Sequence, residues 1–260
     1  MSAAPHNLSP DRLSRFARHI VLPEVGGAGQ VALGSAHVAL VGLGGIGSPA
    51  LQYLAGAGVG TLTLIDRDVV DASNLQRQTI YREADIGRAK ADVAAEWVQR
   101  FDGALKVRTN AGKVGGDSAA HDLEGADLVL DGCDNFATRL IVSDTCTALG
   151  IPLTSAAIGR FQGQVANFAG HVPGQACYRC FVGDAFDADD CDTCAEQGVL
   201  GAMAGMIGAF AAMQAIRVLL AGQAALGDPQ WGQLHLFEGL VPSLRTLRIA
   251  KDPECRGCSG

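Results

Sequence analysis

The chain has 260 residues and a net charge of −7, from 27 acidic and 20 basic residues. Hydrophobic residues make up 48% of it and charged residues 18%, a balance typical of a globular protein and not of a disordered one. The acidic balance argues against nucleic-acid binding, which depends on a basic surface. No signal sequence is recognisable at the N-terminus, so we expect a cytoplasmic protein.

The first 155 residues alternate between segments typical of helices and of strands. We expect a helix around Asp11–Ile20 and then a glycine-rich turn at Gly26–Gly29. Further on we expect strands at 37–41, 61–65, 105–109, 126–131 and 151–155, and helices at 48–56, 84–101 and 138–149. Strands that alternate with helices predict an α/β fold with a Rossmann-like, doubly wound, mainly parallel sheet.

After Gly159 the pattern changes. We expect an antiparallel strand at 164–168, a segment rich in Cys and Asp at 177–194, and alternating strands at 231–238 and 244–249. The apolar segment 199–221 is interrupted by Gln214 and Arg217, and its uninterrupted part, 199–213, falls short of the ~18–20 residues of a membrane span. It therefore predicts a buried helix. We expect one integrated domain with an N-terminal helical arm (1–35), a nucleotide-binding core (36–160) and an antiparallel extension (161–260).

A glycine loop follows the first predicted strand. Gly42-Leu-Gly-Gly-Ile-Gly47 fits the pattern G-x-G-x-x-G and opens a predicted helix, where glycine lets the backbone approach a phosphate. Asp66 lies 19 residues past Gly47 at a strand end, where a carboxylate can accept hydrogen bonds from ribose hydroxyls. These features alone predict an NAD enzyme as readily as an ATP enzyme.

The residues beyond this acid favour a triphosphate. Arg77 carries a planar guanidinium that can bind two phosphate oxygens, and Lys90 adds a second cation at the start of the next helix. Asp134 follows a predicted strand at the edge where ligands collect. Because a carboxylate beside polyphosphate is repulsive without a cation between them, Asp134 is predicted to bind Mg²⁺.

Six of the eight cysteines form C-x-x-C pairs: 177/180, 191/194 and 255/258. Disulfides are disfavoured in the cytoplasm, so we interpret such pairs as thiolate ligands of a structural zinc ion. Cys133 and Cys146 lie in apolar surroundings, and we expect them to be packing residues.

Taken together, these motifs resemble the MoeB/ThiF family, whose members are relatives of the adenylation domain of ubiquitin-activating enzymes. The resemblance covers nearly the whole chain, and the string Ser73-Asn-Leu-Gln-Arg-Gln78 is its most specific marker. The other markers are Arg15–Arg18, Gly42–Gly47, Ala55–Gly60, Gly87–Lys90, Asp131–Asn135, Cys177–Cys180 and Cys255–Cys258.

The resemblance implies an ATP-dependent adenylyltransferase that acts on a small ubiquitin-like sulfur-carrier protein with a Gly-Gly C-terminus. The carrier carboxylate attacks the α-phosphate of Mg·ATP, which gives an acyl-adenylate and pyrophosphate. By analogy Asp66 binds the ribose, Asp134 binds Mg²⁺, and Asn74, Arg77 and Lys90 stabilise charge on the phosphates. The remaining nucleotide-binding residues implied by the motifs are Gly42, Gly44, Gly45, Gly47, Ser73, Leu75, Gln76, Gln78 and Asn135.

Two further implications concern the subunits and the metal. Arg18 matches an arginine that family members extend into the ATP site of the neighbouring subunit, which implies a homodimer with the N-terminal arm as a contact. The family zinc set corresponds to Cys177, Cys180, Cys255 and Cys258. Cys194 matches a cysteine on a flexible loop that in some members carries the acyl group or sulfur. With Cys191 beside it, the interpretations are a redox or sulfur-handling pair, an incidental extra thiol, or a competitor for zinc.

Several alternatives remain open. The carrier could be the small subunit of molybdopterin synthase, which we favour, or the sulfur carrier of thiazole (thiamine) synthesis. The sequence shows no appended rhodanese domain, so we expect a separate sulfurtransferase to supply sulfur. A third relative in the family, the enzyme that cyclises threonylcarbamoyladenosine in tRNA, is disfavoured because it would not need the zinc cysteines. An NAD(P)-dependent oxidoreductase would leave Arg77, Lys90 and Asp134 unexplained, and a non-catalytic scaffold would have lost them.

Overall fold

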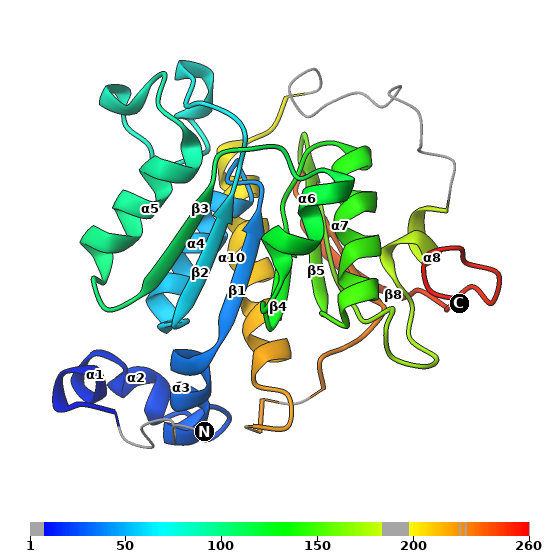
Figure 1. The fold of residues 1–260 in the computed structure, drawn as a ribbon, viewed down its shortest axis with the longest axis horizontal. Helices are drawn as coiled ribbons and strands as arrows, with labels where there is room; N and C mark the ends of the chain where they lie inside the picture. Colours follow the sequence, from blue (N-terminus) through cyan, green and yellow to red (C-terminus); the bar gives the residue numbers. More distant parts are fainter. Residues whose placement is uncertain (1–7, 184–197, 224, 227, 260) are drawn as a thin grey trace.

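An eight-stranded sheet forms the centre of the protein, with the strand order β3-β2-β1-β4-β5-β6-β7-β8 (Figure 1). The computed structural model describes residues 8–183, 198–223, 225–226 and 228–259. The strands are β1 (His37–Val41), β2 (Thr61–Ile65), β3 (Lys106–Asn110), β4 (Leu128–Asp131), β5 (Leu153–Gly159), β6 (Gln162–Phe168), β7 (Gln233–Glu238) and β8 (Ser243–Arg248). Strands β1 to β5 pair in parallel and β6 to β8 join antiparallel, which confirms the predicted fold class.

Strand β1 illustrates why the central strands are apolar throughout. Val38 and Leu40 belong to one hydrophobic core, whereas Ala39 and Val41 belong to the other. Successive side chains of a strand point to opposite faces of the sheet, and both faces of a doubly wound sheet are covered by helices. A strand that is buried on both faces therefore appears in the sequence as an unbroken apolar run, as β1 does.

Helices cover both faces of the sheet (Figure 1). On one face lie α4 (Gly47–Ala57), α5 (Lys90–Phe101) and α10 (Gly201–Leu219); on the other lie α6 (Gly116–Leu123), α7 (Phe136–Leu149) and α8 (Tyr178–Val182). The sequence did not lead us to expect α6 or α8. These helices supply side chains to both cores.

Helix α10 is the buried apolar helix expected from the sequence. By length and composition it meets the criterion for a membrane span, yet half of its apolar window is buried inside the protein. It crosses α4 so closely that a Cβ atom at Gly208 would lie 2.4 Å from the Pro49 ring, so only glycine fits there. Gly208 thus serves close packing of the two helices.

The N-terminal arm differs from the prediction. Instead of one helix around residues 11–20, α1 (Pro10–Arg15) and α2 (Ala17–Ile20) are separated at Phe16. The Phe16 ring is buried against Gly58, where a Cβ atom would lie 2.4 Å from a ring carbon. We attribute the break to this burial, because the backbone at Phe16 leaves the helical conformation as the ring enters the core.

Two further expectations are corrected. The glycines at 26–29 are not a turn, because they begin α3 (Gly26–Ser35), whose Gln30 and Leu33 are buried. That burial outweighs the low helix propensity of glycine. The helix expected at 84–101 begins only at Lys90, since Gly87 adopts a left-handed conformation with φ +87°. The other predicted elements differ from the observed ones by a few residues at their ends.

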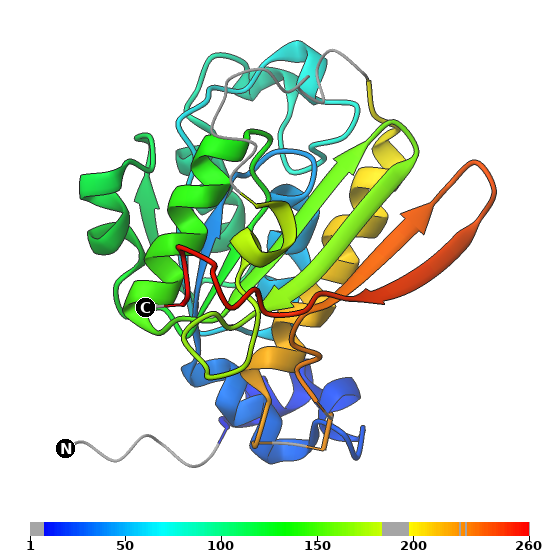
Figure 2. The ribbon, with the colours of Figure 1, turned by 90° about the vertical axis from the view of Figure 1, so that its right-hand side faces the viewer.

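The arm and the C-terminal hairpin lie at different ends of the molecule. Helices α1 to α3 lie below the amino ends of β1 and β2 (Figure 1). The hairpin of β7 and β8 projects from the sheet, and the C-terminal segment runs back toward α8 (Figure 2). The C-terminal segment thereby brings the cysteine pair 255/258 close to the pair 177/180.

Candidate active site

A cavity of 460 Å³ opens at the carboxyl ends of β1, β2 and β4. It lies where the strand order reverses, since β2 and β3 extend from one side of β1 and β4 from the other. Ligands of open α/β sheets bind at such a switch point. The predicted site residues in its lining are Gly42, Gly44, Gly45, Asp66, Ser73, Asn74, Arg77, Gln78, Lys90, Asp134 and Asn135.

Four predicted residues lie outside this lining. Leu75 packs against the hydrophobic core, and the Gln76 backbone lies against Gly201 at the start of α10. Gly47 begins α4, where a Cβ atom would lie 1.9 Å from the Gly42 carbonyl oxygen, so its role is close packing within the loop. Arg18 is exposed on α2, at the opposite end of the sheet from the cavity (Figure 1).

The glycine loop is attached to the neighbouring strand by hydrogen bonds. Gly42 has φ +86°, which favours glycine, and the Leu43 amide donates to an Asp66 carboxylate oxygen at 2.6 Å. The buried Tyr81 hydroxyl donates to the Leu43 carbonyl at 3.0 Å. The loop is therefore held with Gly44 and Gly45 facing the cavity.

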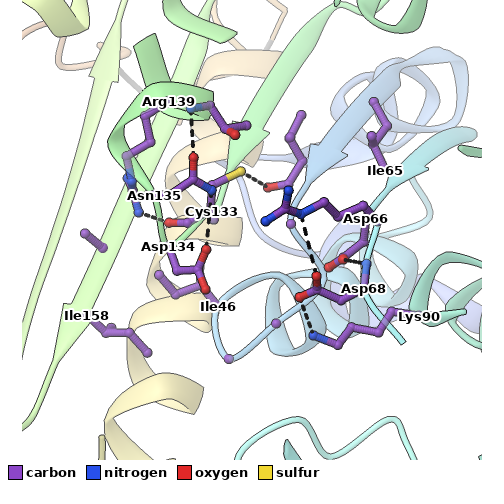
Figure 3. Close-up of a pocket in the computed structure, with 18 of the residues that line it drawn as sticks. Ile46, Ile65, Asp66, Asp68, Lys90, Cys133, Asp134, Asn135, Arg139 and Ile158 are labelled. Carbon is purple, nitrogen blue, oxygen red and sulfur yellow. Dashed lines mark hydrogen bonds and ion pairs between the residues drawn. The ribbon is translucent and has the colours of Figure 1, made fainter. Parts of the chain in front are cut away.

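Asp66 ends β2 on one side of the cavity, as the sequence predicted (Figure 3). Burial raises the pKa of its carboxyl, and the positive charge of Lys90 partly offsets that rise. Its second oxygen accepts from the Asp68 amide at 2.9 Å. Each carboxylate oxygen can accept more than one hydrogen bond, so Asp66 can still bind the hydroxyls of a ribose.

Cationic and amide side chains follow on the same side of the cavity. Lys90 is only 5% exposed and its ammonium group pairs with the Asp68 carboxylate at 3.1 Å. Arg77 is half-buried, and its guanidinium donates to the Ser73 carbonyl at 2.9 Å. Gln78 is buried, and among the described residues its Oε1 has no hydrogen-bond partner. A buried polar atom without a partner is costly, which favours a ligand at this position.

Asp134 lies across the cavity from Asp66, Asp68 and Lys90 (Figure 3). It sits in the turn between β4 and α7, where Asn135 caps the helix by accepting from the Thr138 amide at 2.9 Å. Asp134 itself is exposed, and within the described part of the chain its carboxylate accepts one hydrogen bond, from the Asn135 side-chain amide at 3.5 Å. A carboxylate so weakly engaged is available to a divalent cation, which fits the predicted Mg²⁺ ligand.

Sequence reasoning missed several residues that line the cavity, among them Asp68, Arg139 and Tyr178. Arg139 is 5% exposed and pairs with Asp131, while it also donates to Ser155 and to the carbonyl oxygens of Cys133 and Ala156. Arg139 lies four residues past Asn135, on the same helix face, and this spacing could have identified it. Cys133, expected only as a packing residue, both packs against the core and lines the cavity.

Four cysteines come together where the C-terminal segment meets α8. Sulfur–sulfur distances are 3.9 Å for Cys177–Cys180, 3.6 Å for Cys177–Cys255 and 3.5 Å for Cys180–Cys258. Tetrahedral zinc with Zn–S bonds of about 2.3 Å places sulfur atoms about 3.8 Å apart, so the cluster fits a metal ion. Cys191 and Cys194 lie outside the described residues. Cys146 is buried in the core, as expected.

Replacement of Cys255 by Ser tests the metal cluster. We expect the bound zinc per chain to fall sharply and the free energy of unfolding to drop by about 3 kcal/mol, because a metal links two distant segments. Metal analysis and thermal unfolding measure both effects. The matched control is Cys146→Ala, a buried cysteine outside the cluster, which should retain the metal. An unchanged zinc content in Cys255→Ser would move the metal to Cys191 and Cys194.

Comparisons with known proteins place the chain among enzymes of one family. The model of the ThiF family matches residues 16–257. The SAMP-activating enzyme E1 of Haloferax volcanii is 38% identical over 252 residues, which cover 97% of this chain and 91% of that protein. The sulfur carrier protein adenylyltransferase of Thermus thermophilus is 38% identical over 253 residues, with coverage of 95% and 91%.

Other matches extend the comparison. Adenylyltransferase and sulfurtransferase MOCS3 of Mus musculus is 40% identical over 252 residues, which cover 96% of this chain but only 54% of the mouse protein. Among solved structures, Escherichia coli MccB with ATP superposes with a TM-score of 0.78 at 19% identity, covering 99% of this chain and 76% of that one. At that identity the likeness shows the fold alone.

Proposed function

This chain belongs to the ThiF family, and we propose that it is an ATP-dependent adenylyltransferase that activates the C-terminal carboxylate of a small ubiquitin-like sulfur-carrier protein. The observation that carries the proposal is the cavity, which has an acid suited to a ribose, cationic side chains that include Arg77 and Lys90, and an exposed carboxylate across from Lys90. A hydride-transfer site has no need for Arg77, Lys90 and Asp134 together. We therefore set aside an NAD(P)-dependent oxidoreductase.

The residues of the cavity suit attack by a carboxylate on the α-phosphate of ATP. A carrier carboxylate oxygen would form a bond to the α-phosphorus while the bond to the bridging oxygen of pyrophosphate breaks. The nucleophile is already ionised, so positioning and charge stabilisation account for catalysis. Asp66 would bind the ribose, and Lys90 and Arg77 would stabilise charge on the phosphates. Mg²⁺ held by Asp134 would neutralise charge on the phosphate oxygens.

The carrier is expected to end in Gly-Gly, as the family resemblance implies. The class of the carrier is supported by the two relatives from Haloferax volcanii and Thermus thermophilus, which are a SAMP-activating enzyme and a sulfur carrier protein adenylyltransferase. Within that class we favour the small subunit of molybdopterin synthase and keep the carrier of thiazole synthesis as the alternative. The mouse relative is named as both an adenylyltransferase and a sulfurtransferase, and this chain spans 54% of it.

Carrier-dependent exchange between pyrophosphate and ATP tests the proposal. We expect exchange with one of the two Gly-Gly carriers when both are assayed side by side with the folded, zinc-loaded protein. A carrier truncated by its last glycine is the matched control and should give no exchange. If neither carrier supports exchange, the carboxylate acceptor belongs to another class of molecule.

The site of the proposed enzyme is completed by a second copy of the chain. Arg18 lies far from the cavity of its own chain, at the amino ends of the strands (Figure 1). The family resemblance has this arginine acting in the neighbouring subunit's ATP site. We therefore propose a homodimer in which the arm of each subunit supplies Arg18 to the other.

A further inference from the structure

Tyr178 lies between two cysteines of the cluster and also lines the nucleotide cavity. It follows Cys177 directly in the C-x-x-C segment, and it also lines the cavity below Asp134 and Arg139. Its side chain is only 3% exposed. No other residue between the first two cluster cysteines lines the cavity, so Tyr178 is the point at which the cluster reaches the site.

The segment that carries Tyr178 is held firmly on its outer side. The Tyr178 ring packs edge-on against Phe168, with ring centres 5.8 Å apart, and against Phe181 at 6.1 Å. The next residue, Arg179, donates two hydrogen bonds to Asp144 of α7 at 2.7 and 2.8 Å. Cys177 is buried and its sulfur lies 3.6 Å from that of Cys255. A metal ion bound there would fix one end of this segment.

On its inner side, Tyr178 meets Arg139. Both residues line the cavity, and the Arg139 guanidinium interacts with the Tyr178 side chain. Arg139 in turn donates to the carbonyl of Cys133, the residue that precedes Asp134. Contacts therefore run without a break from the cysteine cluster, through Tyr178 and Arg139, to the turn that presents the proposed Mg²⁺ ligand.

We propose that Tyr178 is a positioning residue that couples metal occupancy of the cysteine cluster to nucleotide binding, through Arg139 and the Cys133–Asn135 turn. The inference rests on the proposed function, because it assumes that the cavity binds Mg·ATP. Arg139 is buried and charged, so its guanidinium must keep its hydrogen-bond partners. If the segment at Cys177 relaxes when the metal leaves, Arg139 loses the Tyr178 contact and shifts its bonds to the turn.

The affinity for Mg·ATP, measured by calorimetry with and without bound zinc, tests the coupling. We expect zinc removal to weaken binding by the wild-type protein about 5-fold, a usual size for coupling between two sites. Tyr178→Phe, which keeps the ring and the metal, should weaken binding by the zinc-loaded protein to a similar degree. In that variant, removing zinc should then change the affinity less than about 2-fold.

The control is Tyr53→Phe, since Tyr53 is 57% exposed on α4 and outside the cavity lining; it should behave as the wild type. Wild-type affinity in zinc-loaded Tyr178→Phe would overturn the inference. The inference would also be overturned if zinc removal weakened the affinity for Mg·ATP equally in the wild type and in Tyr178→Phe. A folded, zinc-loaded wild type that binds no Mg·ATP would instead contradict the proposed function.

A second cycle covers the case in which the zinc-free protein does not stay folded. Tyr178→Phe, Arg139→Lys and the double variant are compared in the zinc-loaded form by the same affinity measurement. If Tyr178 acts through Arg139, the double variant binds Mg·ATP about as well as Arg139→Lys alone. If the fold-losses of Mg·ATP affinity in the two single variants multiply in the double variant, the two residues act independently and the inference is overturned.

Discussion

Replacement of Asp134 by Asn is expected to lower carrier-dependent exchange by about 10²- to 10³-fold and leave the fold intact. The substitution preserves the size of the side chain and removes the charge that would attract Mg²⁺. Asp134 is exposed, and its weak contact with Asn135 contributes little to stability. The exchange rate measured across a range of Mg²⁺ concentrations, together with the thermal midpoint, gives the result.

The matched control for this substitution is Glu124→Gln. Glu124 is an exposed acid at the end of α6 and does not line the cavity, so its loss of charge should change neither the exchange rate nor stability. Exchange by Asp134→Asn at a rate near that of the wild type would refute the proposed metal role. A loss of activity that comes with a lowered thermal midpoint would mean that the turn itself had been disturbed.

The neighbouring Asp131 shows why position within one turn decides a carboxylate's role. Asp131 is fully buried, pairs with Arg139 at 3.3 Å and accepts from the Cys133 amide at 3.0 Å. Its charge is already balanced inside the protein, so it is part of the support of the turn. Asp134 lies three residues on, where the chain has left the core, and its charge faces the cavity.

The sheet and the glycine loop were predictable because their signals are local. Each central strand is a short apolar run, and the pattern Gly42–Gly47 combines a left-handed Gly42 with a glycine that no side chain could replace at 47. The break at Phe16 was not predictable. The sequence of the arm favours a continuous helix, and only the groove at Gly58, far along the chain, draws the ring inward.

In the candidate site, too, the residues in local motifs were predictable, whereas those placed by tertiary contacts were not. Residues in an ordered motif, such as Asp66 and Lys90, were found from the sequence and line the cavity. Within the Ser73–Gln78 string, membership alone did not predict position, because Leu75 turns toward the core while Arg77 faces the cavity. Tyr178 could not have been identified, since its meeting with Arg139 depends on how the C-x-x-C segment docks on α7.

The position of Arg18 leads to a sharper prediction for the proposed homodimer. Helix α2 lies at the amino ends of the strands, so no side chain there can enter the cavity of the same chain (Figure 1). Among the described residues Arg18 forms no ion pair, unlike Arg12 and Arg15, which pair with Asp102. Arg18→Ala should therefore spare stability and lower exchange by about 10²-fold, if its guanidinium stabilises phosphate charge in the other subunit.

Mixed dimers of Arg18→Ala with Asp134→Asn distinguish action across the interface from action within one chain. If Arg18 acts across a two-fold interface, each heterodimer contains one site with both native residues and one site with neither. Random mixing then restores about a quarter of wild-type exchange from two inactive parents, because half the dimers are mixed and half their sites are intact. Native mass spectrometry of the mixture checks that mixed dimers form. Dimers that form but show no recovery would place Arg18 outside the neighbouring site, whereas recovery would establish that each active site is built from two chains.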